Sequence, residues 1–198
     1  GSLLESSISW LIAYDGLSEG ERYDAALELV LTWINRLLFI KLVESQIISF
    51  NSWDEPDKHS FFNDEKIKTF RHIDDLFFKV LALPKNQRDK EVKKNFGDVP
   101  YLNSKLFECT YLERHLNTNI SSLNVAKMKP YKDTVITNPG GKKIKDEISN
   151  INYLIAFLAK YNFGEARKDD TRELINASVL GKIFEKINGY KDGAVFTP

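Results

Sequence analysis

The strongest constraint on the fold is a long helical pattern in the first quarter of the chain. Between residues 20 and 48, apolar side chains recur every three or four positions and form one stripe, made of Leu27, Val30, Leu31, Ile34, Leu37, Leu38 and Leu42. Ser18 is followed three residues later by Glu21, which is typical of a capping box at a helix start. The pattern predicts a long helix at the centre of an all-α bundle.

Shorter helical patterns lie on either side of this stripe. We expect helices over residues 3–14, over 67–80 with Asn63 as cap and an end near Pro84, and over 85–95 with a left-handed end at Gly97. Residues 99–119 are irregular and should form loops and short turns. Two more helices are expected, over residues 148–158 with an end at 162–164, and over 177–187 with Gly189 after it.

One segment departs from the helical pattern. Residues 138–141 read Asn-Pro-Gly-Gly, a dense turn signal between two runs that mix polar and apolar side chains. We therefore expect a small β-hairpin or extended arm over residues 129–144. The expected fold class is mainly α: a helical bundle with a long central helix and a small β-hairpin or extended arm.

The charge balance argues against a general attraction to nucleic acid. Lysine plus arginine and aspartate plus glutamate each number 28, so the formal net charge is zero. Contact with DNA would need a local basic patch. Two clusters are candidates, although acidic neighbours dilute both: Lys90, Lys93 and Lys94, and Lys142, Lys143 and Lys145.

Cysteine usage and hydropathy point to the cytoplasm. The chain has a single cysteine, Cys109, which excludes an internal disulfide and fits a reducing compartment. No apolar run has the length of a membrane span, and the first residues lack the pattern of a secretory leader. We expect a cytoplasmic protein.

No catalytic or metal-binding constellation stands out. The histidines His59, His72 and His115 lie in separate segments, and the spacing of Cys109 and His115 matches no zinc motif. A compact nuclease would require Asp57, Asp64 and Lys66 to converge on a metal ion, but the first lies in a turn-rich loop and the second at an expected helix start. We therefore expect no catalytic residue and no metal ligand.

Four segments, taken in order, resemble the stretch that precedes the catalytic core in one enzyme family. They are residues 35–45 (NRLLFIKLVES), 99–108 (VPYLNSKLFE), 174–185 (LINASVLGKIFE) and 191–198 (KDGAVFTP). The family is that of type IIG restriction-modification enzymes and related large adenine-specific (N6, gamma-type) DNA methyltransferases. Ser104 and Lys105 stand where the family pattern has two glycines. The last segment is similar to the element known as motif X.

The resemblance implies a division of the chain and a role for it. Residues 1–188 would form a helical connector, or spacer, domain, and residues 189–198 would begin the methyltransferase domain. Phe196, Thr197 and Pro198 would form one wall of the S-adenosylmethionine pocket of the parent enzyme. The fragment itself would bind no cofactor and be inactive. Its partners would be the adjoining methyltransferase and nuclease domains and, through the parent enzyme, DNA.

A different class of function remains open. The aromatic residues between positions 101 and 116 could form a docking surface of a stand-alone helical protein-interaction module.

Overall fold

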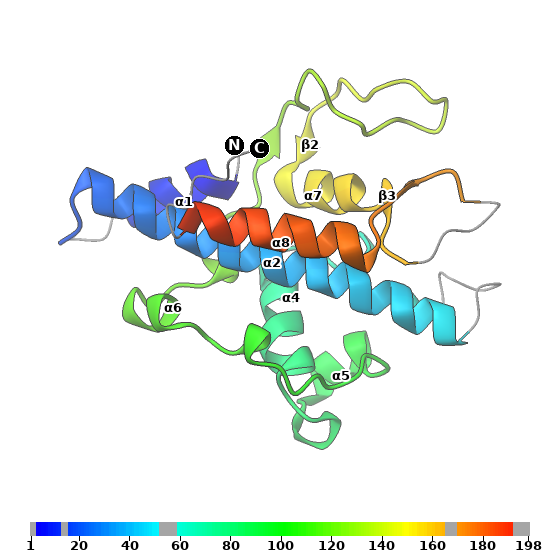
Figure 1. Ribbon diagram of the computed structural model, residues 1–198, viewed down its shortest axis with the longest axis horizontal. Helices are drawn as coiled ribbons and strands as arrows, with labels where there is room; N and C mark the ends of the chain where they lie inside the picture. Colours follow the sequence, from blue (N-terminus) through cyan, green and yellow to red (C-terminus); the bar gives the residue numbers. More distant parts are fainter. Residues whose placement is uncertain (1–2, 13–15, 52–58, 165–169, 192–198) are drawn as a thin grey trace.

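A single long helix organises the molecule. The computed structural model describes residues 3–12, 16–51, 59–164 and 170–191, and α2 (Glu19–Asn51) runs across its whole width in Figure 1. α1 (Leu3–Leu11) packs against one part of α2, and α8 (Ala177–Lys191) lies along it. The expected mainly helical fold with a long central helix is confirmed.

The remaining elements are short. On one side of α2 lie α4 (Phe70–Asp75), a π-helix (Leu76–Leu81), α5 (Lys90–Phe96) and α6 (Tyr111–His115), with 3₁₀ turns at Lys85–Gln87, Lys105–Phe107 and Ile120–Ser122. On the other side lies α7 (Asn150–Leu158). β1 (Lys127–Met128) pairs antiparallel with β2 (Ile148–Ser149), and β3 (Tyr161–Asn162) pairs parallel with β4 (Glu173–Leu174).

The start of α2 follows the predicted capping box. Oε2 of Glu21 accepts hydrogen bonds from the backbone N (2.8 Å) and the hydroxyl (2.6 Å) of Ser18. Leu37 of the apolar stripe enters the core together with Trp33 and Ile40, and each of the three is at most 2% exposed. They belong to one core cluster with buried phenylalanines of α4, the π-helix and the segment after α5. α2 is therefore the element against which the rest of the chain folds.

The helix predicted over residues 67–80 begins later than expected. Asn63 caps only a single turn, because its Oδ1 accepts from the backbone N of Glu65 (3.1 Å) and of Lys66 (3.0 Å). The backbone then becomes extended at Thr69, which is the actual N-cap of α4. The end near Pro84 is confirmed, since the π-helix stops at Leu81.

Three helix ends differ from the prediction. Gly97 has φ −58°, so it is not left-handed; a Cβ there would lie 2.5 Å from the carbonyl oxygen of Lys93, and glycine is needed for space. α7 ends at Leu158, well before residues 162–164, and Asn162 belongs to β3. α8 continues through Gly189 to Lys191. Of the tail proposed as motif X, residues 191–198, only Lys191 is described, as the last residue of α8, and residues 192–198 lie outside the described residues.

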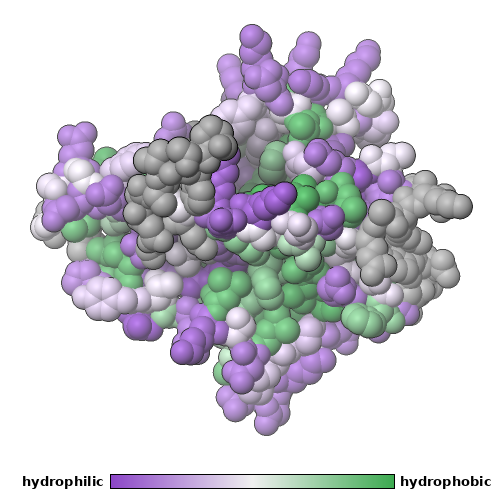
Figure 2. Space-filling view, in the orientation of Figure 1, coloured by the Kyte–Doolittle hydropathy of each residue, from purple (hydrophilic) through white to green (hydrophobic). Residues whose placement is uncertain are grey.

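The predicted arm is present. Thr137 and Lys143 form an antiparallel bridge, and the backbone N of Asn138 donates to the carbonyl of Lys142 (2.8 Å). Gly141 takes φ 76° in the turn between them, a conformation that suits glycine. The arm rises from β1 and β2 at the top of Figure 1, and the corresponding edge of the space-filling view in Figure 2 is mostly hydrophilic. Apolar side chains gather instead across the middle of that face, around and below α8.

Candidate functional site

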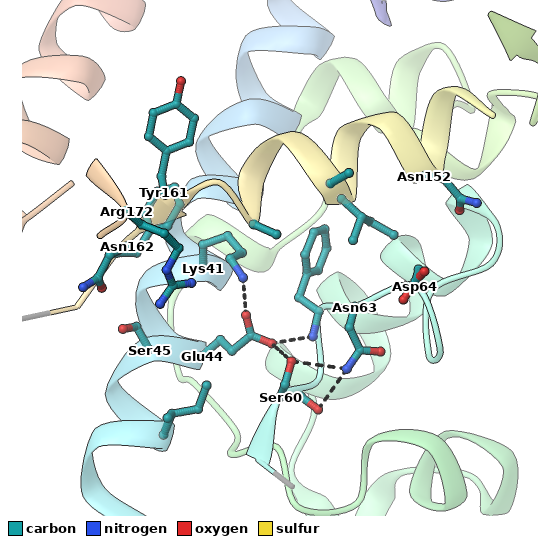
Figure 3. A pocket seen from close by; sticks show the side chains of 16 residues that line it. Lys41, Glu44, Ser45, Ser60, Asn63, Asp64, Asn152, Tyr161, Asn162 and Arg172 are labelled. Carbon is teal, nitrogen blue, oxygen red and sulfur yellow. Dashed lines mark hydrogen bonds and ion pairs between the residues drawn. The ribbon is translucent and has the colours of Figure 1, made fainter. Parts of the chain in front are cut away.

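A polar cleft of about 460 Å³ lies between α2, the segment before α4, α7 and β3 (Figure 3). Three asparagines, two serines and a tyrosine contribute polar groups, and the charged residues are Lys41, Glu44, Asp64 and Arg172. Apolar side chains from α2 and α7 form the remaining walls. A cleft of this size and lining could hold a small polar ligand.

Glu44 holds the base of the cleft together. Its side chain is 3% exposed, and its Oε1 accepts from the hydroxyl of Ser60 (2.9 Å) and the backbone N of Phe61 (2.8 Å) and Phe62 (2.7 Å). Its Oε2 pairs with Lys41, as Figure 3 shows. With four donors bound, this carboxylate attaches the 60–62 segment to α2 and has the role of an anchor.

The two cations of the cleft are also engaged. Lys41 is bound by Glu44, and Arg172 forms a two-pronged contact with Asp170, Nε to Oδ1 at 2.9 Å and Nη2 to Oδ2 at 2.6 Å. The hydrogen bonds and charge of Asp170 raise the pKa of Arg172, and the negative charge of Glu44 adds to that effect. The cleft is therefore a preformed polar surface whose charges are balanced by its own residues.

A second hollow, of about 430 Å³, lies between the end of α2 and α5. It is lined by His59, by Lys66 and by two lysines of α5, Lys93 and Lys94. The carboxylate of Asp98 lies in the same lining and reduces its positive charge. The last turns of α2 and α5 both end here, so part of this positive charge offsets the carbonyl ends of two helices. This arrangement weakens the hollow as an anion site.

The most deeply buried charges form a clamp at the centre of the fold. Arg36 and Glu113 are both 0% exposed at their side chains and form an ion pair of 2.5 Å between Nη1 and Oε1. Arg36 also donates to the carbonyls of Leu106 (2.7 Å) and Glu108 (2.7 Å) and lies over the rings of Phe77 and Phe78. The clamp thus ties the 106–113 segment to α2.

Glu113 accepts a full set of donors. Oε1 also accepts from Trp33 Nε1 (3.1 Å), and Oε2 accepts from Arg36 Nη2 (2.9 Å) and from the backbone N of Thr110 (2.8 Å). Burial alone would raise the pKa of Glu113. The hydrogen bonds and the positive charge of Arg36, together with the hydrogen bonds from Thr110 and Trp33, outweigh burial and lower this pKa. Glu113 is therefore held ionised in the core.

A second buried arginine supports the π-helix. The guanidinium of Arg88, in a residue 3% exposed, donates to the carbonyls of Val80 (2.7 Å), Val99 (2.7 Å) and Leu83 (3.1 Å). Burial lowers its pKa. Arg88 thus joins the last turn of the π-helix, through Val80, to the segments that follow the π-helix and α5.

One acidic group near the clamp has a strongly shifted pKa. Burial, and then the charge of neighbouring Asp75, raise the pKa of Asp74 to about 6, while Lys79 partly offsets them. Burial also raises the pKa of the nearby Cys109 thiol, so that thiol is poorly suited to act as a nucleophile.

The structure does not bring the nuclease candidates together. Asp64 lines the polar cleft whereas Lys66 lines the hollow beside α5, and Asp57 lies outside the described residues. Within the described ranges, no three His, Cys, Asp or Glu side chains are grouped so that they could hold a metal ion. Phe196, Thr197 and Pro198, assigned to the cofactor pocket by resemblance, also lie outside those ranges.

Neither the clamp of Arg36 and Glu113 nor the anchor at Glu44 was predicted from the sequence. Glu113 carried a signal, since Thr110 and Glu113 have the spacing of a capping box and do form one at the start of α6. The sequence carried no signal that Arg36 and Glu44 are buried, because a charged residue within an apolar helix is ordinarily expected to face solvent.

Comparisons with known proteins place the chain in one family. Within the described residues, no helix is long and apolar enough to cross a membrane. No curated protein and no solved structure matches the chain. A family described as a domain of unknown function (DUF7814) matches residues 4–179 of the 198. Because this match covers most of its length, the chain belongs to the DUF7814 family.

Proposed function

We propose that this chain is a helical connector of a restriction-modification DNA adenine methyltransferase, and that it holds the neighbouring domains at a fixed distance and angle. The observation that carries the proposal is that the buried charged side chains hold the fold together. Arg36, Glu113 and Glu44 all bind other parts of the chain to α2. Such contacts make the domain stiff, which is the property that a connector needs.

The length of α2 supports the same role. A helix of 33 residues spans about 50 Å at 1.5 Å per residue. α1 and α8 both contact it, and they are the first and last helices of the described chain. Domains joined at either end would therefore be attached through one rigid element.

The proposal assigns the chemistry to the longer enzyme. S-adenosylmethionine would bind where the methyltransferase domain adds its own residues to Phe196, Thr197 and Pro198, and the boundary between connector and methyltransferase would lie near residues 188 and 189. The partners would be the adjoining methyltransferase and nuclease domains and DNA. The single cysteine fits a cytoplasmic enzyme.

Calorimetry with two proteins tests the assignment. S-adenosylmethionine is titrated into this chain and into the same chain extended by the residues that follow it in its gene. We expect binding, and methylation of adenine in duplex DNA, only with the longer protein. Binding by the short chain alone, or a longer protein that neither binds nor methylates, would contradict the proposal.

An insertion tests the connector role itself. Four Gly-Ser residues placed in the longer protein after Lys191, the last residue of α8, should slow methylation at least tenfold and leave the affinity for S-adenosylmethionine unchanged. The matched control is the same insertion after Gly16, outside the helices. Equal methylation rates in the two variants would argue against a connector.

A second candidate function rests on one exposed aromatic pair. Tyr111 is 74% exposed and stacks on His115 at 5.6 Å, with Tyr101 39% exposed on the same segment. These residues could dock a protein partner, as the interaction-module alternative requires. The other aromatic of the segment, Phe107, is 0% exposed and belongs to the core. Pull-down with purified candidate partners should fail with Tyr111→Ala if this surface is the docking site.

A further inference from the structure

The arm carries an excess of exposed positive charge. We define the basic arm as residues 127–147, from β1 to the residue before β2. It carries six lysines against three acidic residues, in a chain whose formal charge is zero. All six lysines are exposed: Lys127, Lys129, Lys132, Lys142, Lys143 and Lys145.

These lysines are available to a partner. The ion pairs of the described residues join Arg36, Lys41, Lys79 and Arg172 to their carboxylates, and none of them involves a lysine of the basic arm. A lysine that is not paired with a carboxylate can bind an anionic ligand without first breaking an ion pair, so less free energy is lost on binding.

The first side of the basic arm is fixed to the body between β1 and the turn at 138–141. Tyr153 of α7 donates its hydroxyl to Thr134 Oγ1 (2.9 Å), and Lys160 donates to Thr137 Oγ1 (2.8 Å). Tyr131 meets the ring of Tyr153 edge to face, with centroids 5.7 Å apart. Thr134 and Ile136 are buried although their neighbours are exposed. The arm is therefore held in one position, which lowers the entropy lost when a ligand binds.

We propose that the basic arm binds the phosphate backbone of duplex DNA. Its two sides are paired at β1 and β2 and again beside the turn, at Thr137 and Lys143, and the major groove of B-form DNA is wide enough to admit two paired chain segments. Lys127, Lys129 and Lys132 lie on the first side of the arm and the other three lysines on the second, after the turn at 138–141. Lysines on both sides can meet phosphates on both walls of a groove.

Other anionic partners fit the basic arm less well. Insertion into an anionic membrane requires a broad apolar face beside the lysines. The arm exposes only two large apolar side chains, Tyr131 (53%) and Val135 (43%). The hollow beside α5 has fewer lysines and faces two helix ends that carry partial negative charge. Among the surfaces described, the basic arm is thus the strongest site for a polyanion.

This inference rests on the proposed function only for the identity of the polyanion as DNA. The test therefore uses this chain alone, without cofactor or methyltransferase. Fluorescence anisotropy follows the binding of a labelled 20-base-pair duplex at several salt concentrations. The arm variant replaces Lys142, Lys143 and Lys145 by glutamine, and the control variant replaces Lys90, Lys93 and Lys94 in the same way.

The two variants lose the same charge from exposed positions. The arm variant should keep the thermal midpoint of the original chain, and the control variant, which loses two lysines from the last turn of α5, should melt within a few degrees of it. The arm variant should bind the duplex at least about tenfold more weakly, and its slope of log K against log salt should fall by about 2–3, close to 0.9 per lost phosphate contact. The control variant should change affinity by less than about twofold and keep the slope.

Three results would overturn the proposal. One is equal weakening in both variants, which would mean that only overall charge matters. Another is the absence of duplex binding at 50 mM salt. The third is arm-dependent binding to vesicles of phosphatidylserine and phosphatidylcholine without binding to DNA. Arm-dependent DNA binding by this chain together with a longer protein that does not methylate would refute the proposed function and leave the basic arm standing.

Discussion

Replacing Glu113 by glutamine should lower the free energy of unfolding by about 3–5 kcal/mol, the usual cost of removing one partner of a buried ion pair. The substitution keeps the size of the side chain but removes its charge. Arg36, whose side chain is 0% exposed, then has no counter-charge in the core. The expected loss is a large part of the total stability of a domain, about 5–15 kcal/mol.

The hydrogen bonds give a similar magnitude. In the carboxylate, Oε1 accepts from Arg36 Nη1 and Trp33 Nε1, while Oε2 accepts from Arg36 Nη2 and the backbone N of Thr110. A glutamine keeps one oxygen, and its NH₂ group faces the other two donors. Two buried donors without a partner cost about 1–3 kcal/mol each, or about 2–6 kcal/mol together.

Urea unfolding at pH 7, followed by tryptophan fluorescence and by circular dichroism, measures the loss. The control is Lys79→Gln, which breaks a pair of 2.7 Å with Asp75 in which the lysine is 40% exposed. It should cost less than about 1 kcal/mol. A loss below about 1 kcal/mol for Glu113→Gln, with an unchanged m-value, would refute the clamp as a major source of stability.

Glu113→Gln should also change how the stability of the chain depends on pH. The pKa of Glu113 is lower in the folded chain than its usual value of 4.5. Its contribution is therefore complete above pH 4.5 and is lost as the pH falls through the lowered folded pKa. Wild-type stability should fall in this range, and Glu113→Gln should fall less steeply. Parallel curves for the two proteins would contradict this account.

Four further substitutions test other parts of the fold. Arg88→Met removes the donor to several buried carbonyls and should cost about 2–4 kcal/mol in urea unfolding, whereas a surface arginine would cost almost nothing. Gly97→Ala places a Cβ 2.5 Å from a backbone oxygen and should lower stability by about 1–3 kcal/mol, while Gly181→Ala, with open space in α8, should raise it by about 0.5–1 kcal/mol in thermal melts. The pKa of Asp74 rises from 3.8 to about 6 on folding, so its carboxyl favours the folded state below pH 3.8 and this contribution is lost as the pH rises through 6. Asp74→Asn should therefore stabilise the chain by about 1 kcal/mol above pH 6, an effect limited by solvent screening, and should give no gain below pH 4.

Much of the fold was predictable because it depends on local patterns. The stripe between residues 20 and 48 and the Ser18–Glu21 capping box are separated by few residues, and both determine α2. The turn at 138–141 similarly determined the arm. Where only neighbours in sequence decide the structure, periodicity and capping residues are enough.

The parts that were missed depend on distant or very short contacts. Arg36 lies 77 residues from Glu113, and neither residue type indicates burial by itself. β3 and β4 are two residues each, too short to show alternation. The glycine at 97 was expected to provide a positive φ, but it is required because a carbonyl oxygen lies close. Tertiary contacts decided each of these cases.

The features of the candidate sites also divide into those that the sequence predicts and those that depend on tertiary contacts. The lysines of the arm could be counted in the sequence, but only the structure places Lys127, Lys129 and Lys132 with the cluster that follows the turn. The nuclease hypothesis needed Asp64 and Lys66 on one surface, yet the turn capped by Asn63 directs them to different hollows. Two residues that are close in sequence, such as Asp64 and Lys66, need not lie on the same surface when a turn separates their side chains.

The distribution of charge links the basic arm to the connector role. Because the whole chain is neutral and the arm has three more lysines than acidic residues, the body carries a net charge of −3. Near physiological salt, charges act over about 8–10 Å, so DNA would be attracted at the arm, and the net charge of the body would add no general attraction. Contact confined to the arm would leave α2 and its neighbours free to hold adjoining domains.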